Sequence, residues 1–232
     1  MTMKHNHKYL ICIVLLISIA SAQCFAQSGS TWLGARAGIN IGNIADTAIN
    51  SGNGETLSSK TGFDIGGEFD YWFSDNFGIS AQLLYVQKGG TITISDLGMT
   101  GTIGLTVSTL EIPVLLKATF GTGPLKPVFF VGPAIGLKLS ASQHFVAPGQ
   151  DSTESIADSV VSKTYFSIVF GAGATYALSS SMQIFLDAAY DYGLSNINAE
   201  FGKSTGPGTT DNEKINLNDI RINVGILFRL GD

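Results

Sequence analysis

The sequence predicts an all-β fold, an eight-stranded antiparallel up-and-down transmembrane β-barrel with short periplasmic turns and four long outer loops, and three observations lead to it. Segments of about ten to fourteen residues alternate apolar with polar or small residues, as barrel strands do. Short and long connections alternate along the chain, as in membrane barrels. The chain is 44% hydrophobic but only 13% charged, which indicates that part of its surface faces something other than water.

The first 26 residues have the pattern of a cleaved secretory signal peptide. Two lysines precede an apolar run over residues 9–20, which is shorter than the roughly 20 residues that a helix needs to cross a bilayer. Cys24 and Ala26 are small residues at the two positions that a signal peptidase reads. Cleavage after Ala22, an uncleaved membrane anchor and a lipoprotein are the other interpretations.

The remaining segment, residues 27–232, is predicted to be one outer-membrane β-barrel domain. Cleavage after Ala26 removes both cysteines, so thiolate metal sites and cysteine nucleophiles are excluded from the mature chain. It also removes two lysines and no acidic residue, so the formal net charge changes from −5 to −7. This acidic balance argues against a nucleic acid partner, because phosphate binding needs clustered Lys and Arg.

Period-two spacing places the apolar residues of the first four strand segments on one face. These residues are Leu33, Ala35, Ala37, Ile39 and Ile41; Phe63, Ile65, Phe69, Tyr71 and Phe73; Ile79, Ala81, Leu83 and Tyr85; and Leu110, Ile112, Val114 and Leu116. Leu84 and Val86 interrupt the polar face of the third segment. The other three keep a polar or small residue at most positions of the opposite face.

The last four segments alternate in the same way, and the eighth is the most regular. Their apolar residues are Phe129, Val131, Ile135, Leu137 and Leu139; Phe166, Ile168, Phe170, Ala172, Tyr176 and Leu178; Met182, Ile184, Leu186, Ala188, Tyr190 and Tyr192; and Ile220, Ile222, Val224, Ile226, Phe228 and Leu230. Pro113 and Pro133 lie inside predicted strands. We expect a bulge or irregular pairing at each, because proline has no N–H to donate to a ladder.

The connections assign the two ends of the barrel. Short links are predicted at residues 74–76, 121–124 and 179–181, and long polar loops at 42–59, 89–104, 141–163 and 196–217. Both ends of the domain therefore lie on the side of the short turns, which is periplasmic in membrane barrels. Aromatic residues near these turns, including Trp32, Trp72, Phe77 and Phe120, predict a girdle at the membrane interface.

Several runs of residues resemble the Bacteroidota outer-membrane β-barrel family, also called PorT-like, over nearly all of the mature chain. The runs are residues 82–89 (QLLYVQKG), 110–117 (LEIPVLLK), 131–133 (VGP), 170–173 (FGAG), 190–194 (YDYGL) and 228–230 (FRL). The resemblance implies an eight-stranded barrel in the outer membrane of a Gram-negative bacterium. It implies no particular reaction, and a secretion role does not follow from it.

The face predicted to point into the barrel carries charges of both signs. They are Arg36, Glu68, Glu111, Lys117, Asp187, Asp191, Arg221 and Arg229. An eight-stranded barrel has an interior just wide enough for side chains, so we interpret these charges as a structural network of salt bridges that plugs the lumen. The alternative is a small-solute channel, which needs a continuous path of small residues.

The sequence predicts no enzyme, no metal site and no cofactor. His144, with Asp151 and Ser152 nearby, is the one candidate base in the mature chain, and a nucleophilic triad needs these groups within hydrogen-bond reach. We therefore predict a structural or loop-mediated binding role, in which the barrel contacts outer-membrane lipid and the long loops meet an envelope protein or extracellular ligand.

The rival interpretation is a secreted lipocalin-like soluble binding barrel, which would turn the apolar face inward. Glycines share the charged face, and a crowded lumen explains this better than a solvated exterior does.

Overall fold

The computed structural model describes residues 29–46, 55–96, 99–156, 162–195 and 215–231. In these ranges the chain forms nine β-strands: β1 (Ser30–Asp46), β2 (Glu55–Trp72), β3 (Phe77–Asp96), β4 (Met99–Thr119), β5 (Leu125–Ala147), β6 (Gln150–Ser155), β7 (Thr164–Ala177), β8 (Met182–Gly193) and β9 (Ile215–Leu230). No helix within the described ranges is long and apolar enough to cross a membrane. The predicted signal peptide lies outside the described residues.

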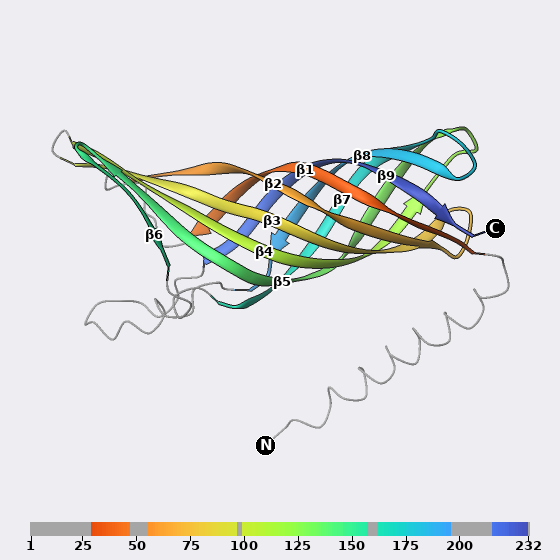
Figure 1. Cartoon of the computed structure of the whole chain (residues 1–232), viewed down its shortest axis with the longest axis horizontal. Helices are drawn as coiled ribbons and strands as arrows, with labels where there is room; N and C mark the ends of the chain where they lie inside the picture. Colours follow the sequence, from red (N-terminus) through yellow and green to blue (C-terminus); the bar gives the residue numbers. More distant parts are fainter. Residues whose placement is uncertain (1–28, 47–54, 97–98, 157–161, 196–214, 232) are drawn as a thin grey trace, which may run out of the picture.

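Eight of the described strands close into a ring in which each strand runs antiparallel to its neighbours (Figure 1). The order is β4-β3-β2-β1-β9-β8-β7-β5, and pairing between β4 and β5 closes it. β6 stands outside the ring and pairs with β5. The fold class predicted from the sequence is therefore confirmed, with one additional strand.

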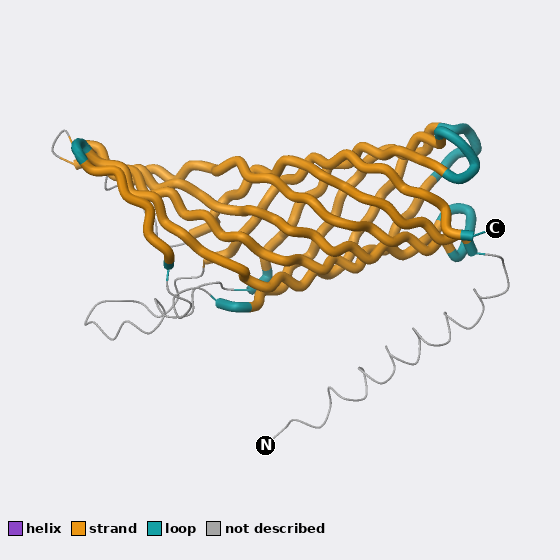
Figure 2. The backbone as a smooth tube through the Cα atoms, in the orientation of Figure 1, coloured by secondary structure: helices purple, strands orange, loops and turns teal. Residues whose placement is uncertain are grey.

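The two ends of the ring differ, as the connection lengths predict. Thr31 of β1 pairs with Leu230 of β9, and Ser30 pairs with Trp72 beside the β2–β3 turn. The first and last described strands thus begin and end beside the short turns, which form compact loops at one end of the tube (Figure 2). This end is the periplasmic end by the usual asymmetry of membrane barrels.

The predicted outer loops are wrong in extent, because strands occupy much of them. β3 and β4 stay paired as far as Asp96 and Met99, and β5 continues past Leu137, its last partner position with β7, to pair with β6. These segments extend beyond the ring as a sheet, which we call the extension (Figure 1). Thr91-Ile92-Thr93-Ile94 explains the difference, since alternating β-branched residues favour a strand even where no membrane surrounds it.

The outward face of the ring is apolar, as predicted. Its exposed side chains include Leu33, Ile39, Phe63, Ile65, Leu83, Val114, Leu116, Phe129, Phe170, Leu186, Ile222, Val224 and Phe228. Val224, for example, is 57% exposed. A soluble barrel would present the opposite parity, so the lipocalin-like interpretation is wrong.

The inward face mixes charged residues with a small apolar cluster. The cluster consists of Leu115, Val128, Phe130, Ala134, Val169 and Ala189. Leu84 and Val86, which interrupt the alternation of β3, are also buried here. An interior filled by side chains from every strand needs apolar as well as polar packing, and this requirement breaks the simple pattern.

The aromatic girdle at the short turns is confirmed only in part. Phe77 and Phe120 point outward and are 45% and 48% exposed. Trp32 and Trp72 instead lie on the inward face. Trp32 is four residues from the buried Arg36 on β1, and Trp72 is four residues from the buried Glu68 on β2, so each shares the face of that charge. Proximity to a turn does not determine the face, and for these two residues the prediction is wrong.

Both prolines coincide with interrupted pairing. The β3–β4 ladder lacks partners at Ile112 and Pro113, and the β4–β5 ladder lacks them at Gly132 and Pro133, while the register on either side is unchanged. A register shift opposite Thr109 lies farther along β5. The predicted irregularity at each proline is therefore confirmed.

Candidate functional site

Charged side chains from six strands of the ring meet inside the barrel in two groups. Every second residue of a strand points inward, and this spacing brings charges far apart in the sequence into contact. The group nearer the short turns contains Arg36, Glu68, Asp70, Lys117 and Asp187. The group nearer the extension contains Lys88, Glu111, Asp191, Asp219 and Arg221.

In the first group, two cations share one carboxylate. Arg36 Nη1 lies 2.8 Å from Glu68 Oε2, and Lys117 forms a second ion pair with Glu68. Lys117 Nζ is also 2.8 Å from Asp70 Oδ2, and Arg36 Nη2 is 3.0 Å from Asp187 Oδ1. These contacts connect β1, β2, β4 and β8 across the lumen.

In the second group, three carboxylates converge on one ammonium. Lys88 Nζ lies 2.8 Å from Glu111 Oε1 and 2.7 Å from an oxygen of both Asp191 and Asp219. Arg221 contacts the same three carboxylates: its Nε lies 2.6 Å from Asp219 Oδ2 and its Nη2 lies 2.5 Å from Glu111 Oε2. Tyr165 donates a hydrogen bond to Glu111 and packs its ring 5.3 Å from Lys88 Nζ.

Burial determines how strongly these contacts affect the stability of the barrel. Lys88, Glu111, Asp191 and Asp219 are at most 2% exposed, so their charges have little access to water. A buried pair is a weak contributor compared with apolar packing, but removing one partner leaves an uncompensated charge and costs about 3–5 kcal/mol. The network is therefore sensitive to loss of any single member.

Seven of the eight charges selected from the sequence lie in these two groups. Arg229 does not: it is exposed at the periplasmic end of β9, and its backbone N–H donates to Ser181 O. Lys88, Asp70, Asp219 and Tyr165 were missed. The first three each lie two residues from an inward position on the same strand: Lys88 from Val86, Asp70 from Glu68, and Asp219 from Arg221. Tyr165 could not be found in this way, because aromatic residues occur on both faces.

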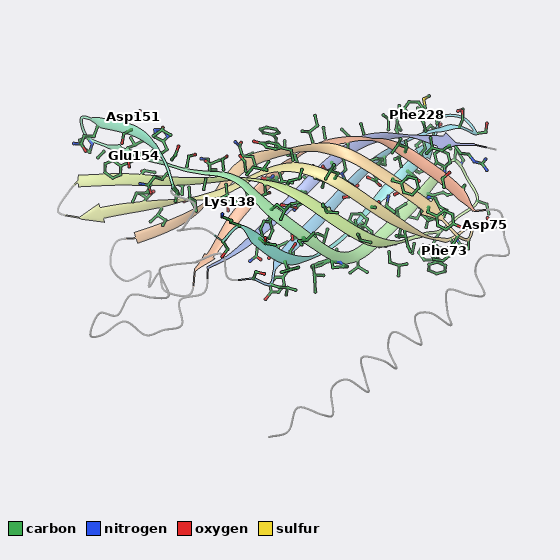
Figure 3. The ribbon with its side chains drawn as sticks, turned by 60° about the horizontal axis from the view of Figure 1, so that its bottom comes forward. Phe73, Asp75, Lys138, Asp151, Glu154 and Phe228 are labelled. Atoms are coloured by element: carbon green, nitrogen blue, oxygen red, sulfur yellow. The ribbon has the colours of Figure 1, made fainter. Side chains whose placement is uncertain are left out.

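The candidate catalytic residues lie in the extension. His144 Nε2 is 2.7 Å from Asp151 Oδ1, and both side chains are exposed. Ser152 follows Asp151 on β6, so its side chain points to the opposite face of the sheet. Figure 3 shows Asp151 and Glu154 at the far end of the extension and Lys138 nearer to the ring.

Among the described residues, no group of three or more His, Cys, Asp or Glu side chains is arranged to hold a metal ion. In the second charge group the carboxylates instead surround an ammonium and a guanidinium.

A closed antiparallel ring with an apolar exterior and a charged interior defines a transmembrane β-barrel. Closure gives the backbone N–H and C=O groups of every strand in the ring a hydrogen-bond partner, which lipid cannot provide. The chain belongs to the family described as outer membrane protein beta-barrel domain, whose model matches residues 25–199. It is a small barrel of the outer membrane of Gram-negative bacteria, and its outward face contacts membrane lipid.

Solved structures with a similar fold have low sequence identity to this chain. OprG from Pseudomonas aeruginosa is 13% identical, with a TM-score of 0.51, and the match covers 89% of this chain and 98% of OprG. Neisserial surface protein A is 14% identical over 88% of this chain and 100% of its own, with a TM-score of 0.47. The outer membrane protease OmpT from Escherichia coli is 10% identical over 90% and 100%, with a TM-score of 0.41. No curated protein sequence matches the chain.

Proposed function

We propose that this protein is a non-conducting barrel that presents a binding surface outside the cell. The observation that supports the proposal most directly is the extension, in which β3, β4 and β5 continue past the ring and β6 is added. Binding sites on rigid barrels are concentrated in the segments that project from them. A paired sheet holds such a surface in place better than a free loop does.

The two faces of the extension differ in chemistry. Residues paired across the strands share a face, and one face carries a row of hydroxyls that includes Thr93, Thr102 and Thr106. The other face carries Ile92, Ile103 and Phe145. A surface that offers hydroxyls on one side and apolar groups on the other suits an extracellular ligand or another envelope protein.

The charge network supports the non-conducting part of the proposal. Its two groups and the apolar cluster lie beside each other in the lumen, and all their members are buried or nearly so. We propose that the network is a structural plug. A small-solute channel is the second candidate, and planar-bilayer recording distinguishes the two: we expect no single-channel conductance from the purified protein, and regular conductance steps would contradict the plug.

Site-specific photocrosslinking in intact cells tests the binding part. A photoreactive residue at Thr102 or Thr153 in the extension should yield a discrete crosslinked species, and the same residue at Ser180 in the periplasmic β7–β8 turn serves as the matched control. An adduct at Ser180 with none at either extension position would contradict the proposed surface.

We also propose that the protein is not an enzyme. His144 has an acidic partner, but the neighbouring hydroxyl of Ser152 belongs to the other face of β6, so a triad would need a rearranged strand. An active-site serine probe of the fluorophosphonate type should leave the folded protein unlabelled.

Two finer assignments complete the proposal. The runs at residues 110–117 and 190–194 support a PorT-like member of the family from the Bacteroidota. Residues 1–26 are proposed as a signal peptide, so N-terminal sequencing of protein from the outer membrane should begin at Gln27. A sequence that begins at Met1 would contradict cleavage.

A further inference from the structure

The periplasmic end of the barrel contains a partly enclosed cavity of about 560 Å³. Its walls are inward side chains from the last levels of the strands together with the β2–β3 and β4–β5 turns. Figure 3 shows Phe73 and Asp75, both of which line it, at this end of the molecule. The volume lies within the roughly 300–1,000 Å³ that is typical of small-molecule sites.

Both tryptophans of the chain, Trp32 and Trp72, line this cavity. The Trp72 ring lies close over β3, since a Cβ added at Gly78 would stand 2.9 Å from Cδ2 and Cε3 of the indole. Trp32 Nε1 donates a hydrogen bond to Ser30 Oγ at 3.2 Å. Each indole is thus held in place by its own surroundings and remains half-buried, with surface turned to the cavity.

Apart from Phe73 and Gly121, the rest of the lining is polar, and it is close to neutral in charge. Asn76, Thr119, Thr175 and Gln183 contribute amides and hydroxyls, while Lys126 and Asp75 contribute one charge of each sign. Asn76 Nδ2 donates to the Thr119 carbonyl oxygen at 2.8 Å, which fixes the amide beside the cavity. Such a lining does not select an anion or a cation, and its hydroxyls and amides do not suit a hydrocarbon chain.

The inner end of the cavity meets the charge network. Lys117 is one inward position beyond Thr119 on β4, and Asp70 is one inward position beyond Trp72 on β2. Their ion pair, 2.8 Å between Nζ and Oδ2, lies between the cavity and the rest of the lumen. The cavity is therefore a pocket with one mouth, facing the periplasm.

We propose that this pocket binds one or two units of a neutral saccharide presented from the periplasm. Indole faces pack against the C–H face of a pyranose ring, while amide and hydroxyl groups pair with its hydroxyls. The combination of two held indoles with four neutral polar side chains matches this ligand class and no net charge opposes it. The site is independent of the extension, which lies at the other end of the barrel.

Intrinsic fluorescence tests the proposal directly, because the pocket holds every tryptophan of the chain. The folded full-length protein in detergent micelles is titrated with N,N′-diacetylchitobiose, a neutral disaccharide. We expect a saturable blue shift of the emission and an approximately twofold decrease in acrylamide quenching, as the sugar displaces water from the indoles.

Two variants and a second probe make the test decisive. Gln183→Ala and Thr175→Ala should each weaken the disaccharide titration at least fivefold, whereas Thr153→Ala in the extension should leave it unchanged. Heat-modifiable gel mobility verifies that each variant is folded. No saturable change with the disaccharide would overturn the proposal, and a change produced instead by trilysine would indicate a basic polypeptide as the occupant.

Discussion

Replacing Lys88 with methionine tests the buried charge network most severely. The ammonium lies within 2.8 Å of three carboxylates, and the substitution keeps an unbranched side chain that is one atom shorter while removing the charge. Arg221 alone then faces Glu111, Asp191 and Asp219. Removing one partner from a buried ion pair costs about 3–5 kcal/mol, so the unfolding equilibrium constant should rise about 150- to 4,000-fold.

The measurement is urea unfolding of the barrel in lipid vesicles, monitored by tryptophan emission and by heat-modifiable mobility. Lys163→Met is the matched control: Lys163 is exposed, so the free energy of unfolding should change by less than about 0.5 kcal/mol. Adding Glu111→Gln to Lys88→Met should recover part of the loss, since it removes one of the uncompensated carboxylates. A Lys88→Met variant within about 1 kcal/mol of the wild type would refute the reasoning.

Other changes test the lipid-facing surface, the strand packing and membrane insertion. Val224→Arg on the outward face should cost about 2–4 kcal/mol of stability in vesicles, whereas Val224→Leu should be nearly neutral. Gly34→Ala should destabilise the barrel or prevent folding, because its Cβ would overlap the Ile226 carbonyl oxygen, while Gly123→Ala, with open space around it, should fold normally. Wild-type protein expressed with its N-terminal segment in a Gram-negative host should fractionate with the outer membrane and migrate differently before and after boiling, and a soluble periplasmic protein would contradict insertion.

The outward face of the barrel could be predicted from the sequence because lipid imposes one requirement on it. Every outward position in the hydrocarbon region must be apolar, so residues such as Ile222 and Val224 repeat at every second place. Because this requirement is strict, the number of strands in the ring and the two ends of the barrel could also be predicted. The irregular pairing at Pro113 and Pro133 was equally predictable, because a residue without an N–H cannot donate a hydrogen bond to the ladder.

The inward face obeys a looser rule, and there the predictions were incomplete. A lumen must be filled, but charged, apolar and aromatic side chains can all fill it if their neighbours match. Lys88 follows Leu84 and Val86 at alternate positions. Its place on the inward face could not be recognised, because the positions before it on that face are apolar. Trp32 and Trp72 show the same ambiguity, because an aromatic residue near a turn serves a girdle or a pocket equally well.

The extension could not be predicted from connection length alone. Loops and paired strands beyond a membrane share polar, Gly- and Thr-rich compositions, and pairing depends on the neighbouring segment as well as on the segment itself. β5 illustrates this: once β7 ends its pairing at Leu137, the freed edge of β5 takes β6 as its partner through the turn at Pro148 and Gly149. Gly149 has φ +78°, which a glycine adopts without strain. In the sequence, the pair Pro148-Gly149 is therefore the local feature that indicates this hairpin.

The charge network also addresses a problem that every closed barrel of this size faces. Backbone pairing alone allows a strand to slip, because a ladder shifted by two residues keeps its apolar face toward lipid. Specific ion pairs across the lumen remove this freedom: Arg36 on β1 reaches Asp187 on β8, past the intervening β9, and Lys88 on β3 reaches Asp191 on β8 and Asp219 on β9. A slipped strand would leave buried charges unpaired, so the buried pairs favour one register even where their net contribution to stability is small.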